Sequence, residues 1–214
     1  MFNFSLPEIL SLAVVLLVAF PIHELSHALA ADYFGDDTPR LQGRLTLNPF
    51  AHLDLVGSLL LLLAGFGWAK PVQVNEYALS MRSRFAPALV ALAGPASNLL
   101  LGLVSGMILA SGLLTVPTVA SRYIPTAYEV LYIFSVINFV LFFFNLIPLF
   151  PLDGEKIAVW FLPRNIADPL AKLRRFSFGP LILVIWLLPA LGVPVLNWLV
   201  FNPSVWLVRL FMGA

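Results

Sequence analysis

The stretch PEILSLAVVLLVAFPIHELSHALAADY, residues 7–33, decides the fold. Its first two thirds are mostly apolar, and a helix that spans a membrane needs about 20 such residues. Its last third carries His23, Glu24 and His27, which are costly inside a bilayer unless they have a partner. The stretch therefore predicts a membrane-spanning helix with a polar site near one end.

The rest of the chain repeats this apolar character. Of its 214 residues 60% are hydrophobic and 11% are charged, against roughly 25% charged in an ordinary soluble domain. Segments 86–114, 127–150 and 178–201 are also long enough to span. The run 55–68 is shorter and holds three glycines, which favours a re-entrant or interfacial segment. Residues 1–214 are thus expected to form a single membrane-embedded domain, an all-α polytopic membrane protein with about four core transmembrane helices.

Lys and Arg gather in the loops after the first and third predicted spans, and only Arg122 and Arg209 fall on the other side. The positive-inside rule makes the rich loops cytoplasmic and places the N-terminus outside. Segments 43–48 and 72–75 alternate apolar and polar residues, which predicts short cytoplasmic strands. The net charge of +1 and the lack of a dense basic stripe exclude nucleic acid as a partner, so the lipid bilayer is the expected environment.

The pattern HELSH indicates a metal site. Residues four apart share one face of a helix, so His23 and His27 can reach one zinc ion while Glu24 stands beside it. A zinc site of this kind takes a third protein ligand, and the chain has no cysteine. The candidates are Asp153, His52 and Asp54.

Membrane depth favours Asp153 among these candidates. It follows Pro148 and Pro151, which end the third span and free backbone that only a protein-lined or watery cavity tolerates. In a soluble protein an Asp-Gly pair after a helix is by default a cap or turn. Glu155 adds a second acid, which either influences the metal or pairs with Lys156.

Two motifs in this order resemble the site-2 proteases, intramembrane zinc metalloproteases with H-E-x-x-H on one span and N-x-x-P-x-x-x-x-D-G on a later one. Here they are residues 23–27 and 145–154. Gly94-Pro95-Ala96-Ser97-Asn98 and the loop 43–54 are similar to the compact prokaryotic branch without PDZ or CBS domains. The resemblance covers most of the chain.

The resemblance implies roles for particular residues. His23, His27 and Asp153 would bind one Zn²⁺ ion, Glu24 would be the general base, and Asn145 would hold the substrate carbonyl or the oxyanion.

Three further residues are expected to contact substrate. Asn98 would hydrogen-bond an unwound substrate, although Gly94 and Pro95 could instead form a close-packing kink. His52 would meet the substrate or act as a structural histidine. Asn75 belongs to the segment 72–75, which would pair with an opened substrate by strand addition.

The implied activity is hydrolysis of peptide bonds in or near transmembrane segments of membrane-protein substrates, close to the cytoplasmic side of the cell membrane. The alternative is a zinc-binding membrane scaffold or a metal transporter without proteolytic activity. A transporter would string ionisable residues through several spans, whereas no histidine follows His52.

Overall fold

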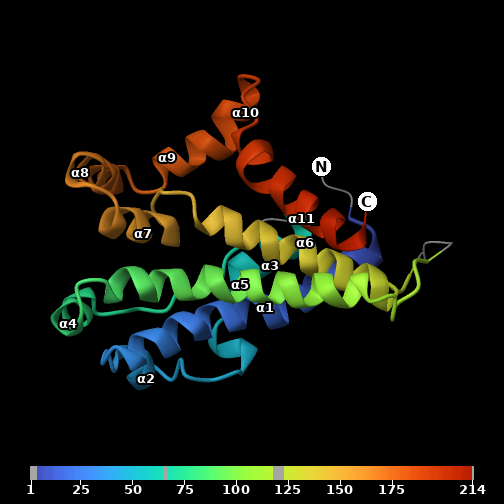
Figure 1. Cartoon of the computed structure of the whole chain (residues 1–214), viewed down its shortest axis with the longest axis horizontal. Coiled ribbons are helices and arrows are strands. Elements are labelled where there is room, and N and C mark those ends of the chain that lie inside the picture. Colours follow the sequence, from blue (N-terminus) through green and yellow to red (C-terminus); the bar gives the residue numbers. More distant parts are fainter. Residues whose placement is uncertain (1–3, 65–66, 118–122, 214) are drawn as a thin grey trace.

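Three long helices form the centre of the molecule. The computed structural model describes residues 4–64, 67–117 and 123–213. In it α1 (Leu6–Tyr33), α5 (Ala86–Ala110) and α6 (Ala127–Asn145) are each long and apolar enough to cross a membrane. They lie side by side along the long axis of the molecule (Figure 1), and each contacts the other two. An all-α polytopic membrane protein, with three of the predicted spans, is thus confirmed.

Two of these helices begin with the same device. Ser5 accepts a hydrogen bond from the Glu8 N–H, and the Glu8 carboxylate accepts one from the Ser5 N–H. Thr126 and Glu129 make the same capping box at the start of α6. Each box satisfies N–H groups that a helix start leaves unpaired, and such groups are expensive near lipid.

Small residues let the three helices approach closely. Val15 and Ala19 of α1 are fully buried and belong to a cluster with Phe134 of α6. On α5, a Cβ atom added at Gly102 would stand only 2.9 Å from the Phe139 ring of α6. Packing of small residues against large rings is a common way to join helices in membranes.

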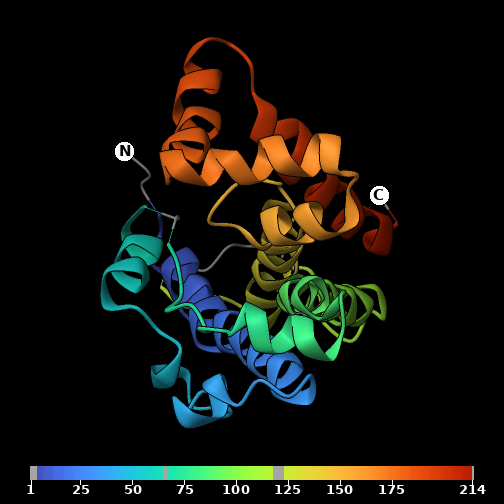
Figure 2. The same ribbon diagram turned by 90° about the vertical axis from the view of Figure 1, so that its left-hand side faces the viewer.

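One end of the bundle carries the short helices. They are α2 (Thr38–Leu41), α4 (Glu76–Arg82), α7 (Asp153–Phe161) and α8 (Arg164–Leu173), and both termini lie toward the opposite end (Figure 1). Viewed along the bundle, α8 lies across this end (Figure 2). The chain bends by 92° between α8 with its continuation η2 (Arg174–Phe176) and the next helical segment.

The run 55–68 forms α3 (Leu55–Ala64), a ten-residue helix, with residues 65–66 outside the described part of the chain. It is too short to cross a bilayer. Leu61 packs it against α1, while Leu55 and Leu63 remain exposed. A short apolar element beside the bundle agrees with the predicted re-entrant or interfacial segment.

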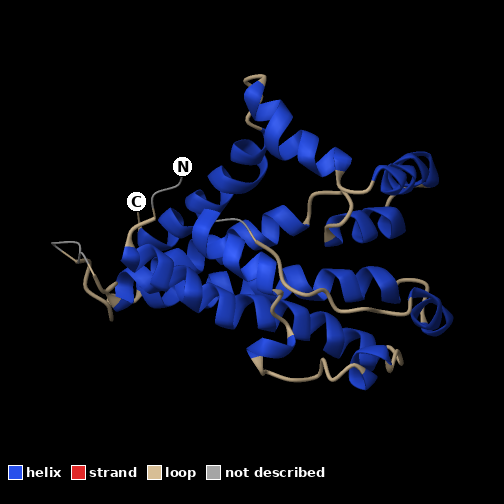
Figure 3. Ribbon diagram, turned by 180° about the vertical axis from the view of Figure 1, so that it is seen from behind, coloured by secondary structure: helices blue, strands red, loops and turns tan. Residues whose placement is uncertain are grey.

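No strand forms among the described residues (Figure 3), and the one β-pairing there is an isolated antiparallel bridge between Leu53 and Ala69. Segment 43–48 is not extended, because Gly43 turns the chain with φ +67° and the short helix η1 (Pro49–Ala51) follows. Segment 72–75 lies outside the helices, just before α4, and alternates between half-buried and exposed residues.

The predicted fourth span, 178–201, is corrected by the structure. A continuous helical arm runs through α9 (Gly179–Ile182), the π-helical η3 (Leu183–Leu187) and α10 (Leu188–Ala190). The chain then turns at Gly192, with φ +82°. A second arm follows in η4 (Asn197–Phe201) and α11 (Asn202–Met212), which packs on α6. Pro194 and Gly192 stop one helix from covering the whole segment.

Candidate metal centre

Helix α1 brings its two histidines together. Their Nε2 atoms lie 3.1 Å apart, and their rings are nearly perpendicular, with centroids 4.7 Å apart. Both side chains are about 90% buried, because this face of α1 packs on α5 and α6. The spacing of four residues thus places His23 and His27 as the sequence predicts.

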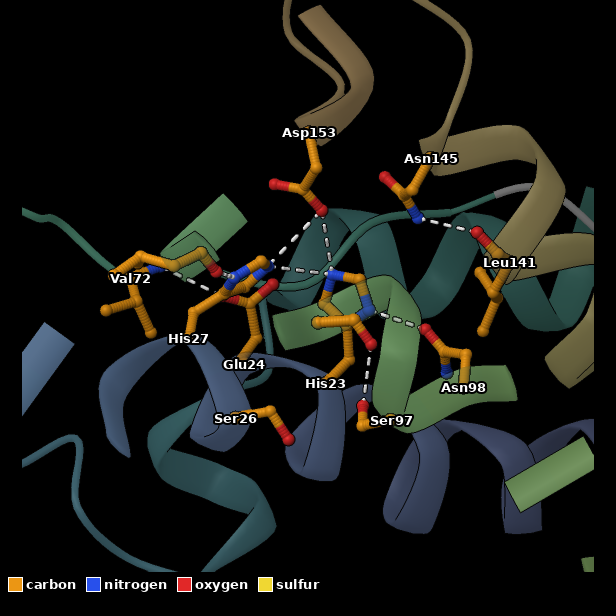
Figure 4. Close-up of polar contacts among 12 residues, drawn as sticks. His23, Glu24, Ser26, His27, Val72, Ser97, Asn98, Leu141, Asn145 and Asp153 are labelled. Carbon is orange, nitrogen blue, oxygen red and sulfur yellow. Dashed lines mark hydrogen bonds and ion pairs between the residues drawn. The ribbon is translucent and has the colours of Figure 1, made fainter. Parts of the chain in front are cut away.

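Asp153 reaches the same point from another direction. It is the first residue of α7, which starts after the break at Pro148 and Pro151, and its Oδ2 lies 3.3 Å from the Nε2 atom of each histidine (Figure 4). A Cβ atom at Gly154 would overlap the backbone of Leu146, so the glycine lets α7 start directly against the end of α6. The Asp-Gly pair is therefore part of the site and not merely a turn.

The three donor atoms fit a zinc ion. Ligand atoms about 2.0–2.1 Å from zinc at tetrahedral angles stand roughly 3.3 Å apart. The observed separations are 3.1, 3.3 and 3.3 Å. In the part of the chain that the structure describes, this is the group of His, Asp and Glu side chains arranged to hold a metal. It leaves a fourth position for water or substrate, as catalytic zinc sites do.

Both imidazoles are held from behind. The Nδ1 atom of His27 lies 2.8 Å from the Val90 carbonyl oxygen, and that of His23 lies 2.5 Å from Asn98 Oδ1. An oxygen at this place accepts a hydrogen bond, so Nδ1 carries the proton and Nε2 keeps its lone pair. Hydrogen bonds of this kind fix the ring orientation and tautomer of metal-binding histidines.

Gly94 of α5 forms the floor of the site. A Cβ atom there would overlap Nε2 of His27 and would come within 2.7 Å of Nε2 of His23. A residue with a side chain therefore cannot occupy position 94 without displacing both rings. The close-packing interpretation of the Gly94-Pro95 pair is thus supported, and what packs against the glycine is the pair of histidines.

Asp153 is suited to the charged form. Burial alone would raise its pKa, but the imidazoles of His27 and His23 that face it hold the pKa below its ordinary range. An ionised carboxylate is the form that binds a metal.

Glu24 lies beside the donor atoms, and its Oε2 accepts a hydrogen bond of 2.9 Å from the Val72 N–H (Figure 4). Among the described residues, Oε1 has no hydrogen-bond partner. The backbone that holds Glu24 is itself fixed, because Arg44 donates to the carbonyl oxygens of Ala51 and Lys70. The loops 44–54 and 69–72 therefore orient the carboxylate.

Two of the predicted ligand candidates lie elsewhere. His52 is fully buried and its Nε2 lies 2.8 Å from the Thr46 carbonyl oxygen, so it acts as a structural histidine inside its loop. Asp54 accepts a hydrogen bond from the Gly57 N–H at the start of α3. Of the candidates for a third ligand, only Asp153 joins the histidines.

Asn98 and Asn75 are also placed differently from the substrate contacts that the sequence predicts. Asn98 is fully buried and bonded to His23 on one side and to Asn138 on the other, so no polar atom is left for a substrate. The side chain of Asn75 caps α4 by accepting from the Ala78 N–H. Both side chains are used within the fold.

Asn145 does lie at the site, beside Asp153 (Figure 4). Its amide nitrogen donates to the Leu141 carbonyl oxygen at 3.0 Å. The second N–H of the same amide remains for another acceptor.

Sequence reasoning missed several supporting groups. Glu155 is almost fully buried and pairs with Arg174 through two hydrogen bonds of 2.7 Å, while Lys156 lies 3.6 Å from Glu76. The Glu155-Lys156 pair was therefore a wrong prediction, because α8 and η2 bring a distant arginine closer. The lone polar residue Asn138 within an apolar span was a signal that could have been used.

A helical membrane protein with a buried site of two histidines and one aspartate, and a glutamate beside it, defines the class of metal-dependent hydrolases. A family description, "Peptidase family M50", matches residues 109–185. The chain is 39% identical over 191 residues to "Putative zinc metalloprotease YwhC" of Bacillus subtilis, covering 89% of this chain and 85% of that protein. It is 30% identical over 200 residues to "Putative zinc metalloprotease Rip2" of Mycobacterium tuberculosis, covering 91% of this chain and 71% of that protein.

The chain belongs to peptidase family M50, the family of the site-2 proteases. No solved structure matches it.

Proposed function

We propose that this protein is an intramembrane zinc metalloprotease, which hydrolyses peptide bonds in or near transmembrane segments of membrane proteins. The observation that carries the proposal is the donor set of His23, His27 and Asp153, buried between long apolar helices with Glu24 beside it. Intramembrane ionisable groups are retained where they serve a function. Peptide hydrolysis is the reaction for which this arrangement is suited.

Zinc is the cofactor that the donor set fits, held by Nε2 of each histidine and Oδ2 of Asp153. When bound, it supplies a Lewis acid that polarises a carbonyl oxygen and lowers the pKa of water. The hydrogen bonds from Nδ1 of each histidine keep the two rings turned toward this position.

Glu24 is the general base of the proposed reaction. The Val72 N–H fixes one carboxylate oxygen and leaves Oε1 to accept a proton from the attacking water. The same carboxylate then passes the proton to the nitrogen of the leaving amine. The second N–H of Asn145 is placed to donate to the substrate carbonyl oxygen as it gains charge.

The proposed substrates are transmembrane proteins cut near the cytoplasmic side. The site lies within the bundle, toward the end at which α2, α4, α7 and α8 gather. Those elements carry most of the lysines and arginines, and such residues gather on the cytoplasmic side of membrane proteins.

A scaffold or a transporter would also bind metal. Neither needs a carboxylate held by a backbone N–H beside the donor atoms. The placement of Glu24 therefore favours the protease.

The test compares purified wild type with Glu24→Gln on a panel of single-span membrane proteins. We expect Glu24→Gln to retain one zinc ion per chain, measured by elemental analysis, and to cut at least about a hundredfold more slowly, because it cannot accept a proton. Glu8→Gln is the matched control, since Glu8 lies on the same helix and only caps its start. It should cut like wild type.

Two outcomes would contradict the proposal. Wild type that holds zinc and cuts no substrate in a broad panel would favour a scaffold or transporter. Folded wild type that binds no zinc would remove the metal site itself.

A further inference from the structure

A line of buried amides joins His23 to the backbone of α6. Asn98 of α5 and Asn138 of α6 are both fully buried between apolar spans. Asn98 Oδ1 lies 2.5 Å from His23 Nδ1, and Asn98 Nδ2 donates to Asn138 Oδ1 at 3.0 Å. Asn138 Nδ2 in turn donates to the Phe134 carbonyl oxygen at 2.8 Å. Three hydrogen bonds thus run in series from the candidate metal centre to a backbone group.

The end of this line fixes the direction of every bond in it. A backbone carbonyl can only accept, so Asn138 must turn its NH₂ group toward Phe134 and its oxygen toward Asn98. Asn98 must then turn its NH₂ group toward Asn138 and its oxygen toward His23. The two orientations of an asparagine amide have nearly the same shape, and only the partners select one of them.

His23 is the receiver of this selection. Because the oxygen of Asn98 faces Nδ1, the proton of the neutral ring resides on Nδ1, and Nε2 keeps the lone pair that faces Asp153. If Asn98 were flipped, its NH₂ group would face Nδ1 and would favour the tautomer with the proton on Nε2. That tautomer cannot ligate a metal through Nε2.

We propose that Asn138 is a positioning residue, which selects through Asn98 the tautomer of His23 that can bind zinc. The inference rests on the proposed zinc site and extends it to a residue that touches neither the donor atoms nor, in this proposal, the substrate.

The second histidine provides an internal comparison. His27 is held by the carbonyl oxygen of Val90, a backbone group that cannot flip. Its tautomer needs no further residue. Loss of Asn138 should therefore affect His23 and leave His27 unchanged.

The main variant is Asn138→Leu, which keeps the volume and removes the acceptor for Asn98. The two orientations of the Asn98 amide then differ little, since each leaves one of its groups unpaired. We expect zinc affinity, measured by competition with a chelator, to fall by about tenfold or more. In the metal-free protein, ¹⁵N spectra of labelled histidine should show a new His23 population with the proton on Nε2 and an unchanged His27.

Ser135→Ala is the matched control. Ser135 is also fully buried on α6 and donates to the Gly102 carbonyl oxygen of α5 at 3.2 Å. It links the same two helices without touching the line of amides. Its loss should leave both the zinc affinity and the histidine spectra of the protein as in wild type.

A rescue distinguishes positioning from packing. In Asn98→Asp combined with Asn138→Leu, the carboxylate can only accept, so it has no wrong orientation and no longer needs Asn138. Carboxylates often hold zinc-binding histidines in this way. Zinc affinity should return toward that of wild type.

If Asn138→Leu does not fold, Asn138→Ser replaces it. A serine hydroxyl can bond back to the carbonyl oxygen four residues earlier, as Ser105 and Ser204 do in this chain, but it is too short to hold Asn98. The same loss of affinity and the same His23 tautomer shift are expected.

The inference is overturned if folded Asn138→Leu binds zinc like wild type with an unchanged His23 spectrum. It is also overturned if affinity falls but the tautomer does not shift and Asn98→Asp gives no rescue, because Asn138 would then act through packing alone. Both results assume a wild type that binds zinc. A wild type that binds none would instead contradict the proposed function.

Discussion

Gly94 shows how a single atom can decide the state of the site. Its Cα lies so close to the two imidazoles that the nearest ring atoms occupy the space of a side chain. A glycine within a helix costs about 1 kcal/mol relative to alanine, and here the fold tolerates that cost because the rings need the space. The role of this residue is thus to let α5 approach the donor atoms of α1.

Gly94→Ala should therefore remove the metal centre while the fold persists. The added methyl group must push both Nε2 atoms from their positions, and small displacements of catalytic groups can cost about a hundredfold in rate. We expect a loss of bound zinc by elemental analysis and a drop in cleavage of about that size. Helical content by circular dichroism should match wild type.

Gly102→Ala is the control for this substitution. It lies on the same helix, and its added methyl group would meet the Phe139 ring at 2.9 Å, away from the donor atoms. It should lower thermal stability without a loss of zinc. Full zinc occupancy and normal cleavage in Gly94→Ala would show that the rings can move aside, against the expectation.

At the scale of elements, α7 carries Asp153 and is held from both sides. It packs on α5, and its Glu155 forms a two-bond ion pair with Arg174 of η2. Glu155 is nearly inaccessible, so this carboxylate depends on its partner for compensation. The pair links the ligand-bearing helix to the segment that lies across the end of the bundle.

Arg174→Gln should leave the Glu155 charge buried and unpaired. Breaking a fully buried pair costs about 3–5 kcal/mol. Because 40% of the Arg174 side chain is exposed, we expect a smaller cost of about 2 kcal/mol in the free energy of unfolding. Reversible denaturation in detergent would measure the loss, and zinc affinity should fall with it because α7 is loosened.

Two comparisons test the cause. Glu155→Gln combined with Arg174→Gln leaves no buried charge, so part of the stability should return. Lys156→Gln breaks the more exposed pair with Glu76, which is 3.6 Å long, and should change stability by less than about 0.5 kcal/mol. Equal effects of Arg174→Gln and Lys156→Gln would argue against a special role for the buried pair.

The elements that could be predicted from sequence are those set by local pattern. Long apolar runs predict α1, α5 and α6, and the spacing of His23 and His27 predicts a shared face of one helix. The fourth predicted span failed because length and hydrophobicity count Gly192 and Pro194 as a small interruption, whereas the chain turns there. An apolar sum does not register such breaks.

The supporting groups of the site could not be predicted in the same way. The partners of Glu24 and His27 are the backbone N–H of Val72 and the carbonyl oxygen of Val90, which every residue possesses and no sequence pattern marks. The Glu155 partner, Arg174, is 19 positions away, beyond the reach of helical spacing. These contacts follow from tertiary packing alone.

At the scale of the whole molecule, charge is distributed unevenly along the bundle. The elements at one end, which include α2, α4, α7, α8 and η2, carry eight of the cations among or next to them: Arg40, Arg82, Arg84, Lys156, Arg164, Lys172, Arg174 and Arg175. Arg209 lies in the last turn of α11, whose end lies with the termini, and Arg122 lies outside the described residues. The asymmetry predicts that the end with α8 faces the cytoplasm.

Single cysteines can test this orientation, because the chain contains none. Lys172→Cys places an exposed thiol on α8, and Ser111→Cys places one just after α5, near the opposite end. In intact cells a membrane-impermeant thiol reagent should label Cys at position 111 and spare Cys at position 172, and both should react after lysis. Because positions 111 and 172 are both exposed in the fold, only the bilayer can separate their reactivity. The reverse pattern would place α8, and with it the Asp153 end of the site, outside the cell, and would overturn the cytoplasmic position of the proposed cleavage.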